Sequence, residues 1–554
     1  MRSSTPMTQD AAVATAASRR LSLEEIVSYC RRRGFIYQAS EIYGGINGFW
    51  DFGPMGAELK RNIKQTWWED MVTRHNPLVA PAGTPSPFEM TGIDSSIIQH
   101  PQTWRVSGHS DLFSDMMVDC HETKKRYRFD HLAGRWIKDR EGNPLFIAAA
   151  PDAPDADAFL DQRARKLLGI SKSREVVWDS PLTDLAELDD FANVLAPHAS
   201  EKGTLTEPRE FNLMFKTYIG AMQTAADAAF LRPETAQGIF LNFRNVLDSG
   251  RFALPLGIAQ IGKSFRNEIT PRHFIFRSRE FEQMEMEFFC PPETSHQWYK
   301  YWQQRRLDWY LDLGLRRENI RVREHEASEL SHYALGTTDI EYAYPFMADG
   351  EFGELEGIAN RGAFDLNSHS MGRLAKADPP ELALDENGAP LHRGSGKNMV
   401  YNDVARGEKY VPYVIEPAAG ADRALLAFLC DALEIEKLGE GGGEDSERAV
   451  LHIHPRLAPV KAAIFPLVKK EGMPEAARDL FGAMKRKWNV TYDEKGSIGR
   501  RYRRADEVGV PVCITIDDET ISQGTVTVRD RDTLEQQRIK LDDCPAYLDK
   551  LIEG

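Results

Sequence analysis

Residues 256–289 constrain the fold of this chain more than any other stretch. They read LGIAQIGKSFRNEITPRHFIFRSREFEQMEMEFF. The second half carries two interleaved sets of side chains, Met284, Met286 and Phe288 against Gln283, Glu285 and Glu287. In a β-strand, this period of two places the apolar set on one sheet face and the amide and carboxylates on the other. We therefore expect a β-hairpin with a polar turn at 267–273.

The polar face of this hairpin predicts a binding site. Arg266 and Glu268 follow the first arm directly, where the turn begins. Burying Arg, Glu and Gln side chains is costly unless a charged, hydrogen-bonding group lies against them. We expect a bound ligand to supply that group.

Helices and further strands are expected on both sides of the hairpin. Leu59, Ile63, Trp67 and Met71 recur every four residues, which predicts one apolar helix stripe, either core or interface. Residues 211–243 read as strands, with RPET forming a turn. An aromatic-rich helix is expected at 296–313, and sheet and loop at 340–376. The strand Val411 to Ile415 should run into a Glu-Pro turn, and Gly420 should begin a Leu-rich helix.

Composition divides the chain into parts. Residues 1–20 are small and polar, which predicts a disordered tail, with a transit peptide as the alternative. Residues 131–208 read as an insertion in the first domain, 21–436. Residues 437–449 are rich in Gly and acids and predict a linker. Residues 450–554 alternate strands and helices, which is typical of a small α/β domain with a mostly parallel sheet.

A local basic run stands out in this last part, although acidic residues outnumber basic ones 84 to 69. It consists of Arg500, Arg501, Tyr502, Arg503 and Arg504. Arginine with an aromatic ring suits RNA phosphates and an exposed base. A solvated helix face is equally compatible with the run. The net charge of −15 argues against a protein that coats nucleic acid indiscriminately.

The cysteines and the hydropathy exclude other classes. The six cysteines are scattered and form no C-x-x-C pair, which favours a reduced, cytoplasmic protein without a thiolate zinc site. No apolar run approaches the ~20 residues needed to span a membrane. The composition, with 42% hydrophobic residues, is typical of a soluble globular protein.

Several motifs together resemble a known family. Phe265-Arg266-x-Glu268, followed by Arg277-x-x-x-Phe281-x-x-x-Glu285, resembles motif 2 of class II aminoacyl-tRNA synthetases. Gly420-x-x-Arg423 resembles motif 3, and the 59–71 helix lies where motif 1 belongs. More narrowly, seven segments resemble the dimeric glycyl-tRNA synthetase family. They are SEIYGGINGFWDFGPMGAELK, LRPETAQGIF, IAQIGKSFRNEITPR, REFEQMEMEFF, ELEGIANR, VIEPAAGADR and TVTVRDRDT.

This resemblance implies both a fold and a reaction. The fold would be α+β: a class II catalytic domain with an antiparallel sheet of six or seven strands flanked by helices, and a C-terminal α/β anticodon-binding domain. The reaction would join glycine and ATP to glycyl-adenylate and pyrophosphate, and then pass glycine to the 3′ end of tRNA(Gly). The resemblance also implies Mg²⁺, no zinc, and a homodimer formed through the motif 1 helix.

The resemblance implies an ATP site in which two arginines act on the phosphates. Guanidinium binds phosphate bidentately and stays charged, so Arg266 suits the α-phosphate and Arg423 the γ-phosphate, as the two catalytic residues. Losing such a clamp typically costs ~3 kcal/mol of barrier. Phe281 would stack on adenine, although the spacing of Arg272-x-x-x-Phe276-x-x-x-Glu280 matches the pattern too. The full set is Arg266, Asn267, Glu268, Phe276, Arg277, Ser278, Arg279, Glu280, Phe281, Glu354, Leu355, Gly420, Ala421, Asp422 and Arg423, with Glu354 also holding Mg²⁺.

Glycine recognition is a problem of excluding every larger amino acid. Acids would hold the ammonium, and Glu234, Glu285 and Glu416 resemble the family's contacts to it. Arg128 resembles the family's partner for the glycine carboxylate. The full set is Arg128, Glu234, Phe281, Glu282, Gln283, Met284, Glu285, Glu416, Pro417, Ala418, Ala419 and Gly420. The family usually has Ser where this chain has Ala418. Steric exclusion works without proofreading, and no editing motif is visible.

Two other classes of function compete with this interpretation. A synthetase-like RNA-binding or polymerase-accessory protein would be expected to lose the motif arginines, and both Arg266 and Arg423 are present. A sister class II enzyme for threonine, proline or serine is disfavoured by the RPET and EPAAG acids.

Overall fold

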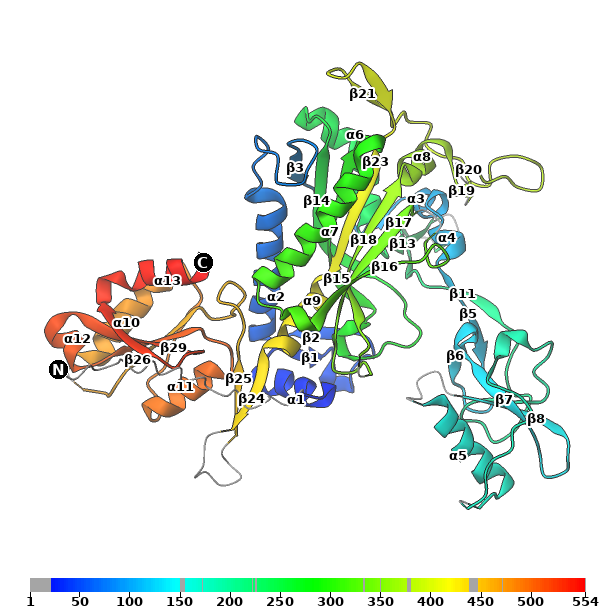
Figure 1. Cartoon of the computed structure of the whole chain (residues 1–554), viewed down its shortest axis with the longest axis horizontal. Helices are drawn as coiled ribbons and strands as arrows, with labels where there is room; N and C mark the ends of the chain where they lie inside the picture. The colour runs from blue at the N-terminus through cyan, green and yellow to red at the C-terminus, as the bar shows by residue number, and fades with distance from the viewer. Residues whose placement is uncertain are drawn as a thin grey trace, which may run out of the picture.

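The computed structural model describes residues 21–149, 155–171, 173–221, 223–224, 227–331, 334–348, 350–375, 380–437, 447–470 and 472–553. The chain forms three parts (Figure 1). A central part surrounds a large sheet, the segment coloured cyan to teal projects from it, and the C-terminal part, coloured orange to red, lies on the opposite side. The predicted tail at 1–20 lies outside the described residues.

A seven-stranded sheet forms the floor of the central part. Its order is β16 (Ile320–Glu324), β17 (Gly336–Tyr342), β18 (Gly353–Gly362), β23 (Tyr413–Gly420), β15 (Glu280–Cys290), β14 (Leu256–Phe265) and β3 (Glu89–Gly92). Neighbouring strands pair antiparallel, except for β14 and β3, which are parallel. This confirms the expected class II sheet.

The central hairpin has the predicted two-faced character. Strands β14 and β15 pair along their whole length, from Leu256 opposite Phe289 to Phe265 opposite Glu280. The apolar side chains of β15 lie in the main core, where the Phe288 ring packs 4.7 Å from that of Trp298. Trp298 belongs to α7 (Ser295–Asp312), the predicted aromatic helix. The opposite face carries polar groups that are themselves buried, so something other than solvent must satisfy them.

The apolar stripe of the motif 1 helix is core within this chain. The helix α2 (Pro54–Trp68) continues as a π-helical turn (Glu69–Thr73), and the four stripe residues are at most 1% exposed. Lys60 on the same helix is also buried. Its Nζ lies 2.8 Å from Glu282 Oε2 and 2.5 Å from Asp422 Oδ1. These ion pairs fix α2 to β15 and to α9 (Ala421–Ala432).

Three predicted elements are wrong. Residues 236–250 form the helix α6 (Ala236–Gly250) rather than a strand, and α8 (Phe364–Met371) lies within the stretch assigned to sheet and loop. Short apolar runs do not distinguish strand from helix, and the spacing of Ile239, Phe243 and Leu247 is helical. The expected turn at Glu416-Pro417 is strand, because β23 runs on to Gly420. Pro417 fits there opposite Ile358, without donating a hydrogen bond.

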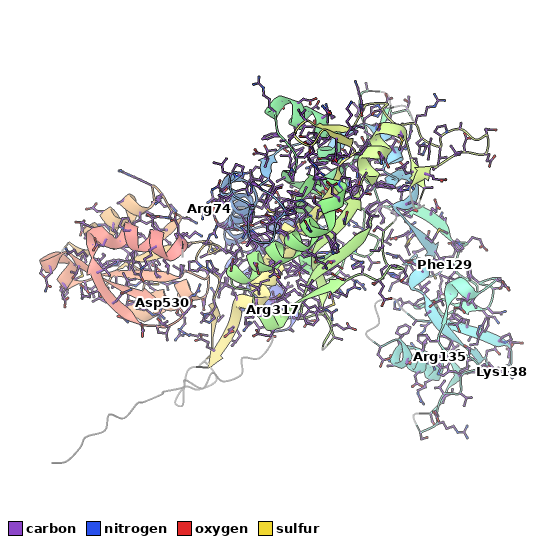
Figure 2. The ribbon with its side chains drawn as sticks, turned by 45° about the horizontal axis from the view of Figure 1, so that its top comes forward. Arg74, Phe129, Arg135, Lys138, Arg317 and Asp530 are labelled. Atoms are coloured by element: carbon purple, nitrogen blue, oxygen red, sulfur yellow. The ribbon has the colours of Figure 1, made fainter. Side chains whose placement is uncertain are left out.

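The insertion is larger than predicted and has its own core. Its elements are β5 (Ser114–Asp119), β6 (Arg126–Arg128), β7 (Ala133–Lys138), β8 (Pro144–Ala148), α5 (Ala156–Leu168), β9 (Thr183–Asp184), β10 (Val194–Leu195) and β11 (Arg209–Asn212). The core extends from Val118 to Leu205, so the boundary at 131 is too late. Phe129, Arg135 and Lys138 lie in this projecting part, well away from Arg74 and Arg317 (Figure 2).

The C-terminal part is α/β, but its sheet is not mostly parallel. The strand order is β27 (Val490–Tyr492), β26 (Ala462–Pro466), β28 (Val512–Ile516), β29 (Thr525–Asp530) and β30 (Gln536–Lys540). The pairs β26–β27 and β26–β28 are parallel, whereas β28–β29 and β29–β30 are antiparallel. The helices are α10 (Met473–Met484), α11 (Ile498–Asp506), α12 (Asp518–Gln523) and α13 (Cys544–Glu553).

The predicted linker falls mostly outside the described residues, at 438–446. Its last part is strand, because β25 (Glu447–Leu451) pairs with β24 (Leu433–Lys437). The remaining elements are α1 (Leu23–Arg33), β1 (Ile36–Gln38), β2 (Trp50–Phe52), β4 (Ile98–Gln99), α3 (Pro101–Val106), α4 (His109–Leu112), β12 (Lys216–Tyr218), β13 (Ala228–Leu231), β19 (Leu374–Ala375), β20 (Glu381–Leu382), β21 (Tyr401–Asp403) and β22 (Glu408–Tyr410). In the described ranges, no helix combines the length and apolarity needed to cross a bilayer.

Candidate active site

A cavity of about 370 Å³ lies against the polar face of the central sheet. Most residues predicted to bind ATP or glycine line it: Glu234, Arg266, Glu268, Phe276, Arg277, Ser278, Phe281, Gln283, Glu285, Glu354, Glu416, Ala418, Ala419, Gly420, Asp422 and Arg423. They come from β15, β18, β23, the start of α9, the loop after β14 and the loop between β13 and α6. The sheet therefore gathers side chains that are far apart in the sequence.

The two motif arginines reach this cavity from different directions. Arg266 follows β14, and its Nε donates to the Pro233 carbonyl at 3.1 Å. Arg423 lies in the first turn of α9, where its Nη1 pairs with Glu354 Oε2 at 3.1 Å. The charge of Arg423 lowers the pKa of Glu354, which is otherwise raised by burial. Two fixed positive charges thus face one space.

The aromatic side chains of the cavity do not play equivalent parts. The guanidinium of Arg423 lies over the ring of Phe276, and its Nε donates to the Phe276 carbonyl at 3.1 Å. Phe281 instead contacts Arg266, whose guanidinium carbon lies 5.4 Å from the ring centre. The ambiguous motif spacing therefore corresponds to two different rings, one beside each arginine.

The surroundings of Arg277 show that this end of the cavity is strongly positive. Burial lowers the pKa of Arg277, and the nearby charges of Arg272, Arg423 and Arg128 lower it further. Glu268 acts in the opposite direction. Guanidinium groups crowded together in this way favour the binding of an anion with several charges.

Carboxylates occupy the other end of the cavity. Glu234 accepts from Gln237 Nε2 at 3.0 Å and lies 3.2 Å from His109 Nε2. Burial alone would raise the pKa of Glu234, but His109 lowers it. Burial, together with the charges of Glu416 and Glu234, raises the pKa of Glu285 to about 8. This end is built to receive a cation.

A buried polar network behind the carboxylates was missed by the sequence reasoning. Arg361, at the end of β18, makes two hydrogen bonds to Asp365 and donates from Nη1 to Glu416 Oε2 at 2.8 Å. Gln237 links Asp365 to His369 Nε2, which lies 2.8 Å from the Gln237 amide oxygen. Arg361 ends the quoted segment ELEGIANR, so its place in a segment that carries the family resemblance was the available signal.

The cavity also has a wall that no motif predicted. It is formed by Ile275, His325, Ser331, Thr337, Asp339, Gly357 and Ala359. His325 Nε2 lies 2.7 Å from Asp339 Oδ2. Most of these residues lie on or next to β17 and β18, where a strand face becomes visible only once the sheet order is known.

Several predicted site residues lie elsewhere. The side chains of Met284 and Leu355 are in the hydrophobic core, because they alternate with cavity-facing neighbours along their strands, and Ala421 lies in the core at the start of α9. Glu282 faces α2 and binds Lys60 and Lys64, and Glu280 pairs with Lys263. The other predicted residues that do not line the cavity are Arg128, Asn267, Arg279 and Pro417.

Arg128 lines a neighbouring pocket of about 230 Å³, which shares Glu268 and Arg277 with the main cavity. Its Nη1 lies 3.2 Å from Asp115 Oδ1, and its Nη2 lies 2.5 Å from Asp130 Oδ2. It does not line the cavity that holds Glu234 and Glu285. In this arrangement of the insertion, the predicted carboxylate partner of glycine lies beside the arginine-rich end of the main cavity.

The basic run 500–504 forms most of α11, but only part of it faces solvent. Arg501 is 3% exposed and donates to the carbonyls of Pro466 and Leu467 at 2.5 and 3.0 Å. The Tyr502 hydroxyl lies 2.7 Å from Thr515 Oγ1. Arg500 and Arg503 are exposed. Arg501 is therefore a structural residue, which corrects its assignment to an RNA-binding patch.

Comparison with protein families identifies two parts of the chain. Residues 216–382 match the "tRNA synthetase class II core domain (G, H, P, S and T)", and residues 461–551 match "Anticodon binding domain". The core match covers half of the central part, including β14, β15 and Glu354. It spans five amino-acid specificities, so it does not by itself choose among them.

Curated relatives narrow this choice. A glycine–tRNA ligase of Rhodopirellula baltica is 56% identical over 524 residues, which are 94% of this chain and 98% of that protein. Glycine–tRNA ligases of Thermobifida fusca and Geobacillus thermodenitrificans are 42% and 44% identical, over 97% and 96% of this chain and 100% and 98% of those proteins. Similarity of this extent, together with the class II sheet and the cavity shared by Arg266 and Arg423, means that the chain belongs to the glycine–tRNA ligase family of class II aminoacyl-tRNA synthetases.

Proposed function

We propose that this protein activates glycine with ATP, forming glycyl-adenylate and pyrophosphate, and then transfers glycine to the 3′ end of tRNA(Gly). One observation carries the proposal. A cavity on the sheet has three arginines, Arg266, Arg277 and Arg423, at one end and three glutamates at the other, of which Glu285 and Glu416 are buried. The first end suits a polyphosphate and the second an ammonium group, so a nucleotide and an amino acid can meet between them.

We assign the phosphates to the arginines. Arg266, whose Nε donates to the carbonyl of Pro233 beside Glu234, suits the α-phosphate, where the reaction takes place. Arg423 suits the γ-phosphate and the adenine ring. Its contact with Phe276 marks the position of the base, because adenine can stack between an aromatic ring and a guanidinium plane once they separate. This assignment gives Phe276, rather than Phe281, the stacking role.

Magnesium fits the residues at the phosphate end. Mg²⁺ prefers oxygen ligands and is usually held by one or two carboxylates together with substrate phosphates. Glu354 lines the cavity on β18 and would hold the ion after leaving Arg423. When bound, Mg²⁺ would neutralise charge on the phosphate oxygens.

We assign the glycine ammonium to Glu234, Glu285 and Glu416. Ala418 and Gly420 line the same cavity on β23, and we assign this wall to the side of the substrate Cα. Because every competing amino acid is larger, exclusion by volume is sufficient and no editing site is needed. The alanine at 418 offers no hydroxyl at a position where the family usually has serine.

The chemistry then needs positioning and fixed charge. The glycine carboxylate attacks the α-phosphate, and the bond to pyrophosphate breaks. Negative charge grows on the phosphoryl oxygens, where Arg266 stabilises it without reorganising. Holding two anions in line supplies most of the remaining acceleration. In the second step, the terminal ribose hydroxyl of tRNA attacks the glycyl carbonyl, and AMP leaves.

We further propose a cytoplasmic homodimer in which the region of α2 meets its copy. Exposed apolar side chains support this, since Ile42 and Tyr43 before α2 are each 87% exposed and Leu78 after it is 86% exposed. Analytical ultracentrifugation of the full chain would give the mass. For tRNA, Arg500 and Arg503 remain candidate contacts in the anticodon-binding part.

ATP–pyrophosphate exchange tests the activation step. Purified protein is assayed with glycine, alanine, serine or threonine, and charging of tRNA(Gly) is then measured. We expect exchange with glycine alone and its loss in R266A. Exchange driven by a larger amino acid, or none with glycine in folded protein, would contradict the proposal.

A further inference from the structure

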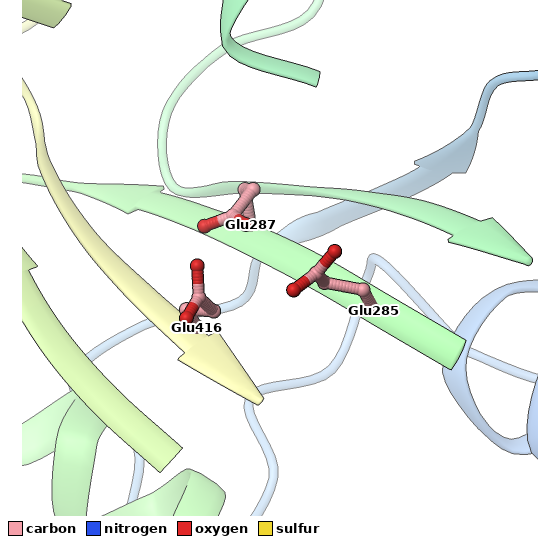
Figure 3. A group of neighbouring side chains, drawn as sticks. All are labelled: Glu285, Glu287 and Glu416. Atoms are coloured by element: carbon pink, nitrogen blue, oxygen red, sulfur yellow. The ribbon is translucent and has the colours of Figure 1, made fainter. Parts of the chain in front are cut away.

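Three glutamates meet behind the amino-acid end of the cavity (Figure 3). Glu285 and Glu287 lie on β15, and Glu416 lies on β23. Each offers a carboxyl oxygen within 4.8 Å of the others, and all three are buried. Glu285 and Glu416 line the cavity, whereas Glu287 does not and is fully buried. Glu287 therefore needs a role other than direct contact with the substrate.

The hydrogen bonds of the three carboxyl groups differ. Glu416 accepts from Arg361, and Glu285 accepts from the Thr235 hydroxyl. For Glu287, no donor among the described residues reaches either oxygen. An ionised carboxylate only accepts hydrogen bonds, and leaving one buried without a donor costs several kcal/mol. A protonated carboxyl group, by contrast, can donate to a neighbouring carboxylate.

We propose that Glu287 keeps its proton and donates a hydrogen bond to Glu416, which makes Glu287 a positioning residue for the carboxylate that receives the substrate ammonium. The inference rests on the proposed glycine activation. Glu416 is then held from two sides, by the Arg361 guanidinium and by the Glu287 carboxyl, while its remaining lone pairs face the cavity. Glu287 contributes a hydrogen bond and no charge.

The charges around Glu287 support this arrangement. The facing groups are Glu285 on its own strand, Glu416 on β23 and Arg361 on β18. Behind them, Asp365 on α8 accepts two of the Arg361 hydrogen bonds. Burial raises the pKa of Glu287 well above its ordinary value, and Glu416 raises it further, against the lowering effect of Arg361. A second full charge beside Glu416 would turn that carboxylate away from its place.

The same three carboxyl groups could instead hold a metal ion. A divalent cation there would neutralise Glu416 and displace the proton of Glu285, so these carboxylates would no longer be available to the ammonium. A shared proton orients Glu416 and leaves its charge available. This difference makes the two arrangements separable by experiment.

A matched pair of substitutions tests the proposal. E287Q keeps the shape and a donor, and E287M keeps the volume without one. We expect the KM for glycine in pyrophosphate exchange to stay within about twofold of wild type in E287Q and to rise about tenfold in E287M, because a hydrogen bond to a charged group is lost. The KM for ATP should stay unchanged in both. Equal defects in both variants, or wild-type behaviour in both, would overturn the proposal.

A second readout does not depend on activity. Infrared difference spectra of wild type minus E287Q should show the carbonyl stretch of a protonated carboxyl group at neutral pH. Its absence would overturn the proposal, as would a rise in Tm with Mn²⁺ or Mg²⁺, without nucleotide, that E287Q abolishes. If wild-type exchange does not depend on glycine, the proposed function fails, and the infrared band still reports on Glu287 itself.

Discussion

Arg423 holds its guanidinium carbon 4.5 Å from the centre of the Phe276 ring. The two groups cover each other, and under the proposed assignment adenine binds between them. This contact distinguishes Phe276 from Phe281 as the ring beside Arg423, whereas the motif pattern alone matched both residues.

We expect F276A to raise the KM for ATP about tenfold or more, because stacking of a base on an aromatic ring is worth ~1–3 kcal/mol. F281A is the matched control, and its effect on the KM for ATP should be smaller. Steady-state pyrophosphate exchange with varied ATP gives both values. A larger rise in F281A would return the stacking role to that residue.

The two arginines should differ in which kinetic constant they change. R266A removes a charge at the reacting phosphate, so kcat should fall by about two decades. R423K keeps a charge but loses the flat group that lies on the base, so the KM for ATP should rise more than kcat falls. Single-turnover adenylate formation separates binding from chemistry. A change in KM alone for R266A would contradict its place at the α-phosphate.

Glycine binding should release a proton at neutral pH. The pKa of Glu285 is raised from 4.5 to about 8, so the free protein holds a proton there. The positive charge of an incoming ammonium favours the ionised carboxylate, and Glu285 loses that proton. Affinity for glycine should therefore increase as the pH rises toward 8. Calorimetry in buffers of different ionisation enthalpy counts the proton, and E285Q should abolish its release. Proton uptake on binding would contradict this assignment.

The raised pKa of Glu285 also determines how the stability of the fold changes with pH. Because its folded pKa is raised, Glu285 contributes stability that is complete below 4.5 and is lost as the pH rises through about 8. Urea unfolding of wild type and E285Q across this range should show a smaller decline in the variant. An equal decline in both would exclude Glu285 as its source.

In α11, buried and exposed arginines should behave differently. R501A leaves the Pro466 and Leu467 carbonyls without their donor, and should lower the free energy of unfolding by ~1–3 kcal/mol. R500E with R503E should leave stability unchanged, raise the KM for tRNA and spare pyrophosphate exchange. Loss of exchange in that double variant would show that these residues do not act through tRNA alone.

Much of the site was predictable because it follows local rules. Alternation along 283–288 gave both faces of β15, and Gly420 began its helix as expected. The motif residues Arg266 and Arg423 were named from short segments and share one cavity. Leu355 and Met284 were misplaced because a motif covers consecutive residues, whereas a strand sends neighbours to opposite faces.

Other features depend on contacts between distant segments. Arg361 joins Asp365 and Glu416 across β18, α8 and β23, and Glu287 acquires its surroundings from the same packing. Arg128 could be recognised in a basic strand, but its distance from Glu234 depends on how the insertion sits. The helix α6 was missed because a short apolar run satisfies both periods until its partners are known.

The root of the insertion has a mechanical consequence. His109, on α4, lies against Glu234, and Phe113 at the end of the same short helix lies 5.5 Å from the guanidinium carbon of Arg266. β5, the first strand of the projecting arm, begins at the next residue. The base of the arm therefore contacts both Glu234 and Arg266. Any displacement of the arm would therefore shift the Glu234 carboxylate and the Arg266 guanidinium together.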